Sequence, residues 1–338
     1  MSQLSRPRRN RSSAAVRSLV RETSLEPGHL VQPLFLAYQP ELRLPIESLP
    51  GQYRLGLEEL LKEVAACRQV GIQAFMLFPA VPEEYKDKTG TYATDPDNFY
   101  LAAARRLKET FPDICLISDV ALDPYSIDGH DGVVRNGQID NEETLPLLGA
   151  MAVAQAAAGF DIIGPSDMMD GRVRRIREDL DRAGYYGTAI MSYTAKYASA
   201  FYGPFRDALD SAPRMDAEIP GDKKTYQMDP ANRREALREA RLDEAEGADY
   251  LMIKPALNYL DVIYQLRQLS DLPIAAYHVS GECAMVLAAA RAGWLDYQTA
   301  ATEALTCIRR AGADVIITYF AKDYASWYQQ ERMAGLPL

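Results

Sequence analysis

Two lysines, Lys196 and Lys254, stand where apolar runs of the chain end. An ammonium group buried in such a place is costly unless it is neutralised or paired. Burial and a second ammonium group nearby both lower the pKa of a lysine. A neutral amine adds to a ketone and forms an imine, which activates the neighbouring carbon. These residues therefore predict Schiff-base chemistry at Lys254, with Lys196 facing the same site.

An ion pair is the alternative interpretation of Lys254, with a carboxylate such as Asp119 as its partner. The presence of a second lysine favours imine formation over this alternative. Polar residues at the ends of later apolar runs, Ser280 and Tyr319 among them, also indicate a reactive site rather than a packed interior.

Basic side chains in the long segment after the fifth apolar run are candidates for binding a carboxylate. They are Arg206 and the pair Lys223-Lys224, and Arg and Lys are common carboxylate partners. A solvated loop face is the alternative. The loops after the last two runs hold little glycine and carry acids, so a phosphate site there is disfavoured. We therefore expect a small carboxylate as substrate.

Eight short apolar runs alternate with amphipathic stretches from about residue 30 onward. Such runs are typical of parallel strands that are buried on both faces. Eight strand–helix units predict an α/β fold, a closed (β/α)8 TIM barrel whose active site lies at the C-terminal strand ends. An open doubly wound sheet is the alternative, but it would normally show a glycine-rich phosphate turn. The runs cover residues 30–36, 72–80, 114–122, 161–167, 187–196, 250–256, 273–281 and 313–321.

Three joints from helix into strand share one pattern, a glycine followed two residues later by an aspartate. Glycine is the residue that most often ends a helix, so the pattern predicts helix ends. Asp229-Pro230 is expected to open the helix before the sixth strand, as N-cap and first residue. The three joints are Gly159-Phe160-Asp161, Gly247-Ala248-Asp249 and Gly312-Ala313-Asp314.

Two segments do not fit the strand–helix repeat. Residues 1–28 form an N-terminal arm that is rich in Arg and Ser, and residues 29–338 form the barrel domain. Residues of about 203–228 form a long insertion, and loops of this length are commonly lids or binding loops. A transit peptide is one interpretation of the arm, and packing on a neighbouring subunit is the other.

The composition excludes several classes of protein. The net charge of −10 disfavours nucleic acid as a partner. No apolar run approaches the roughly 20 residues that span a bilayer, so no membrane is expected. The four cysteines are scattered without metal-ligand spacing, as is typical of reduced thiols in a cytoplasmic protein.

The chain closely resembles the porphobilinogen synthase family, also called 5-aminolevulinate dehydratase. The resemblance covers nearly the whole chain. It includes RPRRNR near the start, a feature of the family's arm. The longer motifs are MSYTAKYASAFYGPFRDA at 191–208, KTYQMDPANRREALRE at 224–239, GADYLMIKPALNY at 247–259, YHVSGECAM at 277–285 and RAGADVIITYFAKD at 310–323.

The resemblance implies condensation of two molecules of 5-aminolevulinate to porphobilinogen with release of two waters. Lys254 would form the Schiff base with the first-bound substrate and Lys196 with the second. No organic cofactor is expected, because each imine activates its own ketone. Asp119 and Ser166 would contact the amino end of the first substrate, and Ser280 and Tyr319 would bind its carboxylate. The carboxylate of the second substrate would be bound by Arg206, Lys223 and Gln227.

The metal sites depart from one branch of this family. Zinc-type relatives carry three cysteines after the third strand, whereas this chain has Ala121, Asp123 and Asp131. Hard oxygen ligands disfavour zinc, so we expect either magnesium at Asp123 and Asp131 or no metal there. The resemblance also implies a regulatory magnesium at Glu239, between subunits. Composition alone would predict that Glu239 is a solvated acid on a helix surface.

The resemblance also bears on assembly. The arm motif belongs to the mature proteins of the family, which weakens the transit-peptide interpretation, and it implies a homo-octamer in which the arm wraps a neighbour. Two rival functions remain at this point. One is a lysine-dependent aldolase or dehydratase that acts on a sugar phosphate, and the other is a catalytically silent barrel that serves as an assembly subunit.

Overall fold

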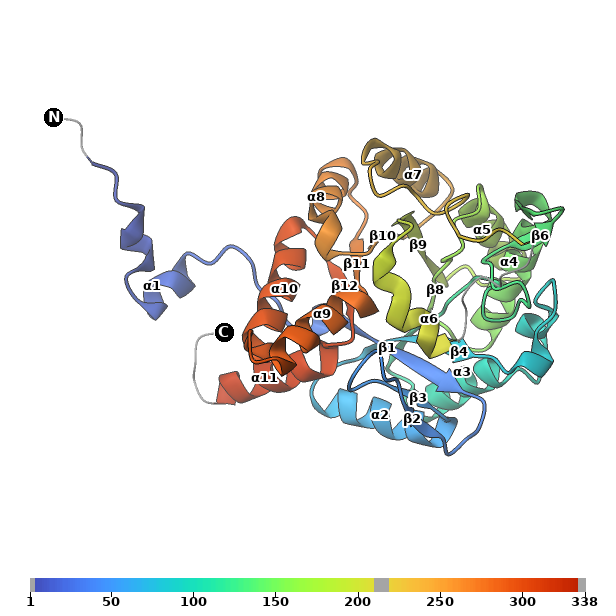
Figure 1. The fold of residues 1–338 in the computed structure, drawn as a ribbon, viewed down its shortest axis with the longest axis horizontal. Helices are drawn as coiled ribbons and strands as arrows, with labels where there is room; N and C mark the ends of the chain where they lie inside the picture. The colour runs from blue at the N-terminus through green and yellow to red at the C-terminus, as the bar shows by residue number, and fades with distance from the viewer. Residues whose placement is uncertain (1–3, 210–218, 334–338) are drawn as a thin grey trace.

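The computed structural model describes residues 4–209 and 219–333, and these residues form a closed parallel barrel surrounded by helices (Figure 1). The barrel closes because β1 pairs with β12 through Leu30 with Ile316 and Val31 with Ile317. The predicted (β/α)8 barrel is confirmed, and each predicted apolar run supplies one strand. The strands are β1 (Leu30–Ala37), β4 (Ala74–Ala80), β5 (Cys115–Ile117), β8 (Ile162–Ile163), β9 (Ala189–Lys196), β10 (Tyr250–Lys254), β11 (Ile274–His278) and β12 (Val315–Thr318).

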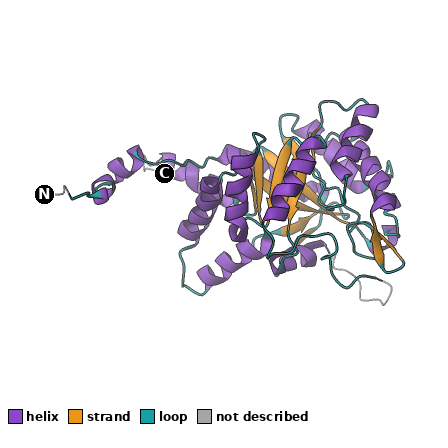
Figure 2. Cartoon of the chain, turned by 90° about the horizontal axis from the view of Figure 1, so that it is seen from above, coloured by secondary structure: helices purple, strands orange, loops and turns teal. Residues whose placement is uncertain are grey.

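Helices follow the strands and form the outer layer of the barrel, as the two cartoon views show (Figures 1 and 2). In α3, Tyr100, Ala103 and Leu107 are buried, and Asn98 caps the helix by accepting from the Tyr100 amide. The helical period places such residues on one face, which packs on the strands. The helices are α2 (Leu57–Gln69), α3 (Phe99–Thr110), α4 (Asn141–Ala157), α5 (Arg172–Arg182), α7 (Arg234–Ala245), α8 (Leu260–Leu269), α10 (Tyr297–Ala311) and α11 (Ala321–Met333).

Several elements lie outside the barrel repeat. The β2–β3 hairpin extends the sheet beside β1, and β6 and β7 form a separate hairpin before α4. Two helices, α6 and α9, lie at the C-terminal ends of the strands. Their bounds are β2 (Arg43–Pro45), β3 (Tyr53–Leu55), β6 (Val133–Arg135), β7 (Gln138–Asp140), α6 (Gly203–Leu209) and α9 (Ser280–Arg291). Short 3-10 helices span Pro7–Arg11 (η1), Pro27–His29 (η2), Glu83–Tyr85 (η3), Thr91–Thr94 (η4), Ala200–Tyr202 (η5) and Leu257–Tyr259 (η6).

The three glycine–aspartate joints end helices as predicted and also connect strands. Gly159, Gly247 and Gly312 have φ of 101°, 103° and 122°, a left-handed conformation that favours glycine. Each aspartate then accepts a hydrogen bond from the backbone of the strand that precedes it around the barrel. The bonds run from Leu116 N to Asp161 at 2.8 Å, from Ile190 N to Asp249 at 2.8 Å and from Ile274 N to Asp314 at 2.9 Å.

The predicted start of the helix before the sixth strand is wrong. Asp229 and Pro230 form a turn, in which the Asp229 side chain accepts from the Ala231 amide at 2.8 Å, and α7 begins only at Arg234. An aspartate followed by a proline serves a turn as well as a helix start, so the local sequence does not separate the two.

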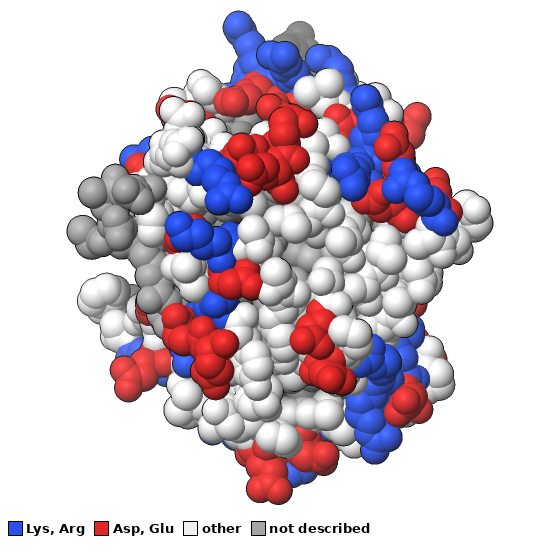
Figure 3. Space-filling model, turned by 90° about the vertical axis from the view of Figure 1, so that its right-hand side faces the viewer, with Lys and Arg blue, Asp and Glu red and all other residues white. Residues whose placement is uncertain are grey.

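The N-terminal arm leaves the barrel and carries η1 and α1 (Ala14–Leu19) away from it (Figures 1 and 2). Of the insertion at 203–228, α6 and residues 219–228 are described, and residues 210–218 lie outside the described part. No helix among the described residues is long and apolar enough to cross a bilayer. Acidic and basic side chains lie side by side over the face shown in Figure 3.

Candidate active site

The two lysines occupy paired positions on adjacent strands. Lys196 ends β9, Lys254 ends β10, and the two residues are register partners. Both side chains are buried, with 6% and 5% of their residue surface exposed. The sequence prediction that both lysines face one site at the strand ends agrees with this geometry.

Lys196 is bound to a carboxylate. Its Nζ donates to Asp131 Oδ2 at 2.7 Å and also to the Ser166 carbonyl. Lys223 Nζ donates to the same aspartate at 2.5 Å and lies 3.2 Å from Asp123 Oδ2. Burial alone would raise the pKa of Asp131, but the two ammonium groups outweigh it and hold this pKa well below the ordinary range. Asp131 is therefore an anion shared by two lysines.

Lys254 has no comparable partner. Within residues 4–209 and 219–333, no carboxylate lies within ion-pair distance of its Nζ. Burial and then the charge of Lys196 lower the pKa of Lys254, the charge of Asp119 opposes them, and the resulting pKa is about 7. About half of the amine is therefore unprotonated and able to act as a nucleophile at pH 7. The alternative of a direct ion pair with Asp119 does not hold for the described residues.

Asp119 is a buried carboxylate whose backbone is held on both sides. The Tyr100 hydroxyl accepts from the Asp119 amide at 3.1 Å, and Gln155 donates to the Asp119 carbonyl at 2.9 Å. Burial and then the charge of Asp123 raise the pKa of Asp119 to about 7, which a hydrogen bond from Ser166 opposes. Asp119 can therefore give or take a proton at neutral pH.

Ser280 and Tyr319 lie at the ends of the neighbouring strands β11 and β12, as predicted. Both are buried. Ser280 Oγ accepts from the Phe205 amide at 3.0 Å, and the Tyr319 hydroxyl lies 3.1 Å from the hydroxyl of Tyr277. Two hydroxyl groups on adjacent strand ends can together hold one carboxylate.

The second predicted carboxylate clamp is only partly assembled. Arg206 is half-buried in α6, and Gln227 is buried with an Oε1 atom that has no hydrogen-bond partner among the described residues. The Met228 amide donates to the Lys196 carbonyl at 3.0 Å, which fixes Gln227 beside the end of β9. Lys223 is bound to Asp123 and Asp131 rather than left free for a substrate.

The predicted active-site magnesium at Asp123 and Asp131 does not fit this arrangement. The Lys223 ammonium lies between the two carboxylates and supplies the charge that a cation would bring. Neighbouring His130 is held by Tyr226 at 3.0 Å and by the Pro220 carbonyl at 2.8 Å. Over the described part of the chain, no group of three or more His, Cys, Asp or Glu side chains is arranged to hold a metal ion.

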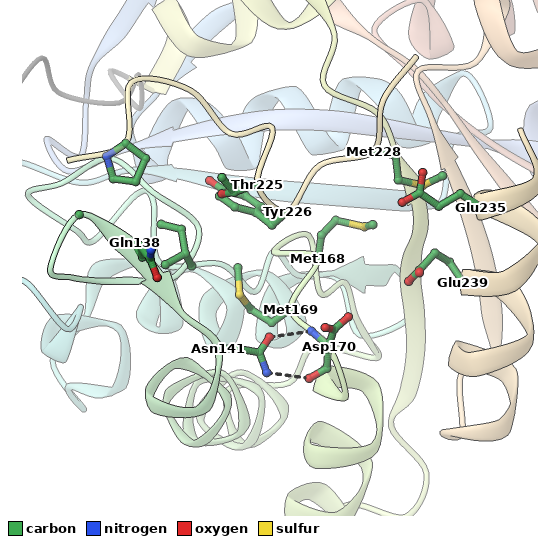
Figure 4. A pocket seen from close by; sticks show the side chains of 13 residues that line it. Gln138, Asn141, Met168, Met169, Asp170, Thr225, Tyr226, Met228, Glu235 and Glu239 are labelled. Carbon is green, nitrogen blue, oxygen red and sulfur yellow. Dashed lines mark hydrogen bonds between the residues drawn. The ribbon is translucent and has the colours of Figure 1, made fainter. Parts of the chain in front are cut away.

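Glu239 lines a cavity of about 510 Å³, so the interpretation as a fully solvated acid is wrong. Glu235 and Glu239 extend from α7 toward this cavity, and Asn141 and Asp170 face them (Figure 4). Burial, together with Asp243, raises the pKa of Glu239. Magnesium is commonly held by one or two carboxylates and several waters, so the carboxylates of Asp170, Glu235 and Glu239 in this lining fit such an ion, although the same lining holds three methionines.

Four aromatic rings surround the Lys254 amine, a feature that the sequence analysis missed. Nζ lies 4.6 Å from the ring centroid of Tyr277, 4.9 Å from Phe205, 5.1 Å from Tyr193 and 5.3 Å from Tyr202. An aromatic side chain in an apolar run is usually a core residue, so the sequence alone does not single out these rings. The register of β9, β10 and β11 places Tyr193 and Tyr277 beside the amine, and η5 and α6 add Tyr202 and Phe205.

The barrel and its paired lysines define a class, the enzymes that activate carbonyl substrates through a lysine imine. Comparisons with known proteins define the family. The model of delta-aminolevulinic acid dehydratase matches residues 4–327, and the chain belongs to this family, as its motifs indicated.

Relatives match over most of the chain. The chloroplastic delta-aminolevulinic acid dehydratase of Physcomitrium patens is 56% identical over 330 residues, which are 97% of this chain and 75% of that protein. The enzyme of Chlamydia pneumoniae is 52% identical over 316 residues, 94% of each chain. The crystal structure of the Toxoplasma gondii enzyme in complex with its product porphobilinogen has a TM-score of 0.93 and 52% identity, and the match covers 96% of this chain and 92% of that one.

Proposed function

We propose that this chain condenses two molecules of 5-aminolevulinate through Schiff bases at Lys254 and Lys196. Family membership supplies the overall reaction, in which two 5-aminolevulinate molecules give porphobilinogen and two waters. The main support for two imines, one for each ketone, is that the two buried lysines are register partners on adjacent strands. Buried amines at paired positions hold two substrates side by side, which favours reaction between them.

Lys254 reacts first in this proposal. About half of its amine is neutral near pH 7, whereas Lys196 is bound to Asp131 and has to leave that carboxylate before it can attack. The Lys254 nitrogen adds to the ketone carbon of one substrate. The ketone oxygen then departs as water, and a protonated imine remains. This order supports the assignment of Lys254 to the first-bound substrate.

The neighbouring polar groups bind and orient the substrates. We assign the first substrate's carboxylate to Ser280 and Tyr319, and its amino end to Asp119 and Ser166. Asp119 also suits proton transfer, since its pKa is about 7. We assign the carboxylate of the second substrate to Arg206, Gln227 and Lys223. To bind it, Lys223 would exchange its two aspartates for this carboxylate. That exchange would also release Asp131 for the proton that Lys196 has to lose.

We further propose magnesium, rather than zinc, as the metal of this chain, with Glu239 as a ligand of a regulatory ion. The support is the absence of thiols at Ala121, Asp123 and Asp131 and the presence of three carboxylates, those of Asp170, Glu235 and Glu239, in the lining of the Glu239 cavity. The ion would supply positive charge beside α7. A homo-octamer is the assembly we propose, because nearly all described arm residues before Leu25 are exposed and available to a neighbouring copy.

Borohydride trapping tests the proposed function. The protein is incubated with 5-aminolevulinate, reduced, digested and examined by mass spectrometry, while a colorimetric assay follows pyrrole formation. We expect an adduct on Lys254, its loss in Lys254→Ala, and severely impaired pyrrole formation in Lys196→Ala. The exposed Lys62 provides a matched control, since Lys62→Ala is expected to behave as the wild type. An unmodified wild-type protein would rule out the Schiff base.

A further inference from the structure

The environment of the Lys254 amine differs from that of Lys196. Lys196 is bound to the carboxylate of Asp131, whereas the Lys254 amine lies over the ring faces of Tyr193, Tyr202, Phe205 and Tyr277. All four centroids lie within about 6 Å of Nζ, the range in which a cation is attracted by a ring face. We call these four rings the aromatic box.

The box is held in place by contacts that turn its hydroxyl groups away from the amine. Tyr202 donates to the Lys254 carbonyl at 3.0 Å, and Tyr193 donates to the Met76 sulfur at 3.4 Å. The Tyr277 hydroxyl is hydrogen-bonded to the Tyr319 hydroxyl. The phenol groups are thus occupied elsewhere, and what remains for the amine is the π-face of each ring.

Two strands, one 3-10 helix and one α-helix build the walls of the box. Tyr193 lies on β9 and Tyr277 on β11, the strands on either side of β10, while Tyr202 and Phe205 come from η5 and α6. The Phe205 amide donates to Ser280, which ties α6 to α9. The box is therefore part of the folded frame around Lys254.

The imine reaction poses an electrostatic conflict that such a box lessens, because ring faces attract the free ammonium too but more weakly than a carboxylate in contact would. The amine must be neutral before it attacks, but the protonated imine that it becomes is a cation in a buried site. A carboxylate in contact with Lys254 would stabilise the cation and also keep the free lysine protonated. Ring faces attract a cation without a formal charge, and their attraction falls off over a short distance.

We propose that the aromatic box stabilises the protonated imine at Lys254 and so takes the place of a direct counter-ion. The proposal rests on the proposed function and deepens it, since it names the groups that hold the first covalent intermediate. The step is balanced: the Lys254 amine and the substrate ketone take up one proton and give the protonated imine and one water. The ring faces act on the nitrogen and take no part in the proton transfer.

Fluorinated phenylalanines at position 205 test the proposal in the full-length enzyme. Each added fluorine weakens the negative face of the ring but keeps its shape and apolar character. From 4-fluoro- to 3,4,5-trifluorophenylalanine, the borohydride-trapped fraction at Lys254 is expected to fall stepwise, by about 2-fold to 30-fold in total. Phe205→Leu, which keeps an apolar side chain without a ring, is expected to match the trifluoro variant.

The pH profile supplies a second readout. Lys196, Asp119, Asp131 and Asp123 are the charged groups that act on Lys254, and fluorination leaves all of them in place. A weaker box also destabilises the free ammonium form, so half-maximal trapping should move to lower pH while the plateau falls. A packing defect alone would lower the plateau without ordering the variants by fluorine number.

Phe78 provides the matched control. Its ring packs against Phe205 at 4.9 Å and Tyr277 at 6.3 Å, but within the described residues no face of it lies over Lys254. With the same fluorinated series at position 78, the trapped fraction at Lys254 is expected to equal that of the wild type. The proposal would be overturned if the trapped fraction at Lys254 did not change with fluorine number at position 205, or if it fell equally at both positions. If the wild-type enzyme forms no adduct at Lys254, the proposed function fails instead.

Discussion

Lys196 and Lys254 occupy directly paired positions on β9 and β10, but within residues 4–209 and 219–333 a carboxylate binds Lys196 alone of the two. The same register thus presents one paired ammonium group and one amine whose pKa is lowered to about 7 by burial and by its neighbour. Two equivalent lysines would compete for the first substrate. This asymmetry gives them an order.

The rate of adduct formation at Lys254 is expected to rise with pH and to be half-maximal near pH 7. Below that pH the nitrogen carries a proton and has no lone pair for attack, so the rate should fall about tenfold per pH unit. Quenched-flow trapping with borohydride between pH 5 and 9 measures this dependence. A midpoint near pH 10, the value of an unperturbed lysine, would contradict the assignment.

Asp119→Asn tests the same pH dependence, because the pKa of Asp119, like that of Lys254, is about 7. The ionised Asp119 raises the pKa of Lys254, so its removal should move the trapping midpoint to lower pH. Pyrrole formation should nevertheless decrease, since the site loses its group for proton transfer. A midpoint that moves upward would show that Asp119 does not act on Lys254 as the geometry indicates.

Asp131→Asn is expected to destabilise the protein by about 3 kcal/mol, because a buried cation that loses its partner is strongly destabilising. The change leaves Lys196 and Lys223 with weaker partners, the Ser166 carbonyl and Asp123. Urea unfolding followed by circular dichroism measures the loss.

A surface pair is the control for that measurement. Asp222 pairs with Lys224 at 2.9 Å, and their side chains are 53% and 75% exposed. Asp222→Asn is therefore expected to change the free energy of unfolding by no more than about 0.5 kcal/mol. Equal losses in the two variants would mean that Asp131 is not a buried counter-ion.

The sequence predicted the barrel and the two lysines well because each depends on local pattern. A buried strand is a continuous apolar run, and a lysine that ends such a run lies at the strand end whatever the rest of the chain does. Ser280 and Tyr319 were located by the same reasoning.

The partners of these groups could not be predicted in the same way. Asp131 and Lys223 are 92 residues apart and meet only through the loops above the strands. The sequence therefore offered Asp131 as a possible magnesium ligand, with no metal as the alternative, whereas in the structure Asp131 binds two lysines. The aromatic box is also a product of register, because no spacing in the chain distinguishes Tyr277 from a core tyrosine.

Glu239→Gln is expected to raise the magnesium concentration for half-maximal stimulation at least about tenfold, because the ion loses a charged ligand. Asp123→Asn should leave that concentration unchanged even if it lowers turnover, since Lys223 already neutralises this aspartate. Magnesium titration of the chelated enzyme measures both variants. Glu244→Gln, an exposed change on α7, is the control. A magnesium response lost in Asp123→Asn but kept in Glu239→Gln would reverse the assignment.

Gly281→Ala is expected to reduce kcat/KM about 100-fold, because displacements of about 1 Å near an active site have effects of this size. A Cβ atom at Gly281 would lie 2.5 Å from the Phe201 carbonyl oxygen and 2.7 Å from Phe201 Cα, so the backbone of η5 would have to move. That movement would displace Tyr202 and Phe205 from Lys254 and weaken the bond from the Phe205 amide to Ser280. Gly187→Ala is the control, since its added Cβ would meet no atom within 4 Å. The pyrrole assay gives kcat/KM, and wild-type kinetics for Gly281→Ala would show that the contact between η5 and α9 does not position the site.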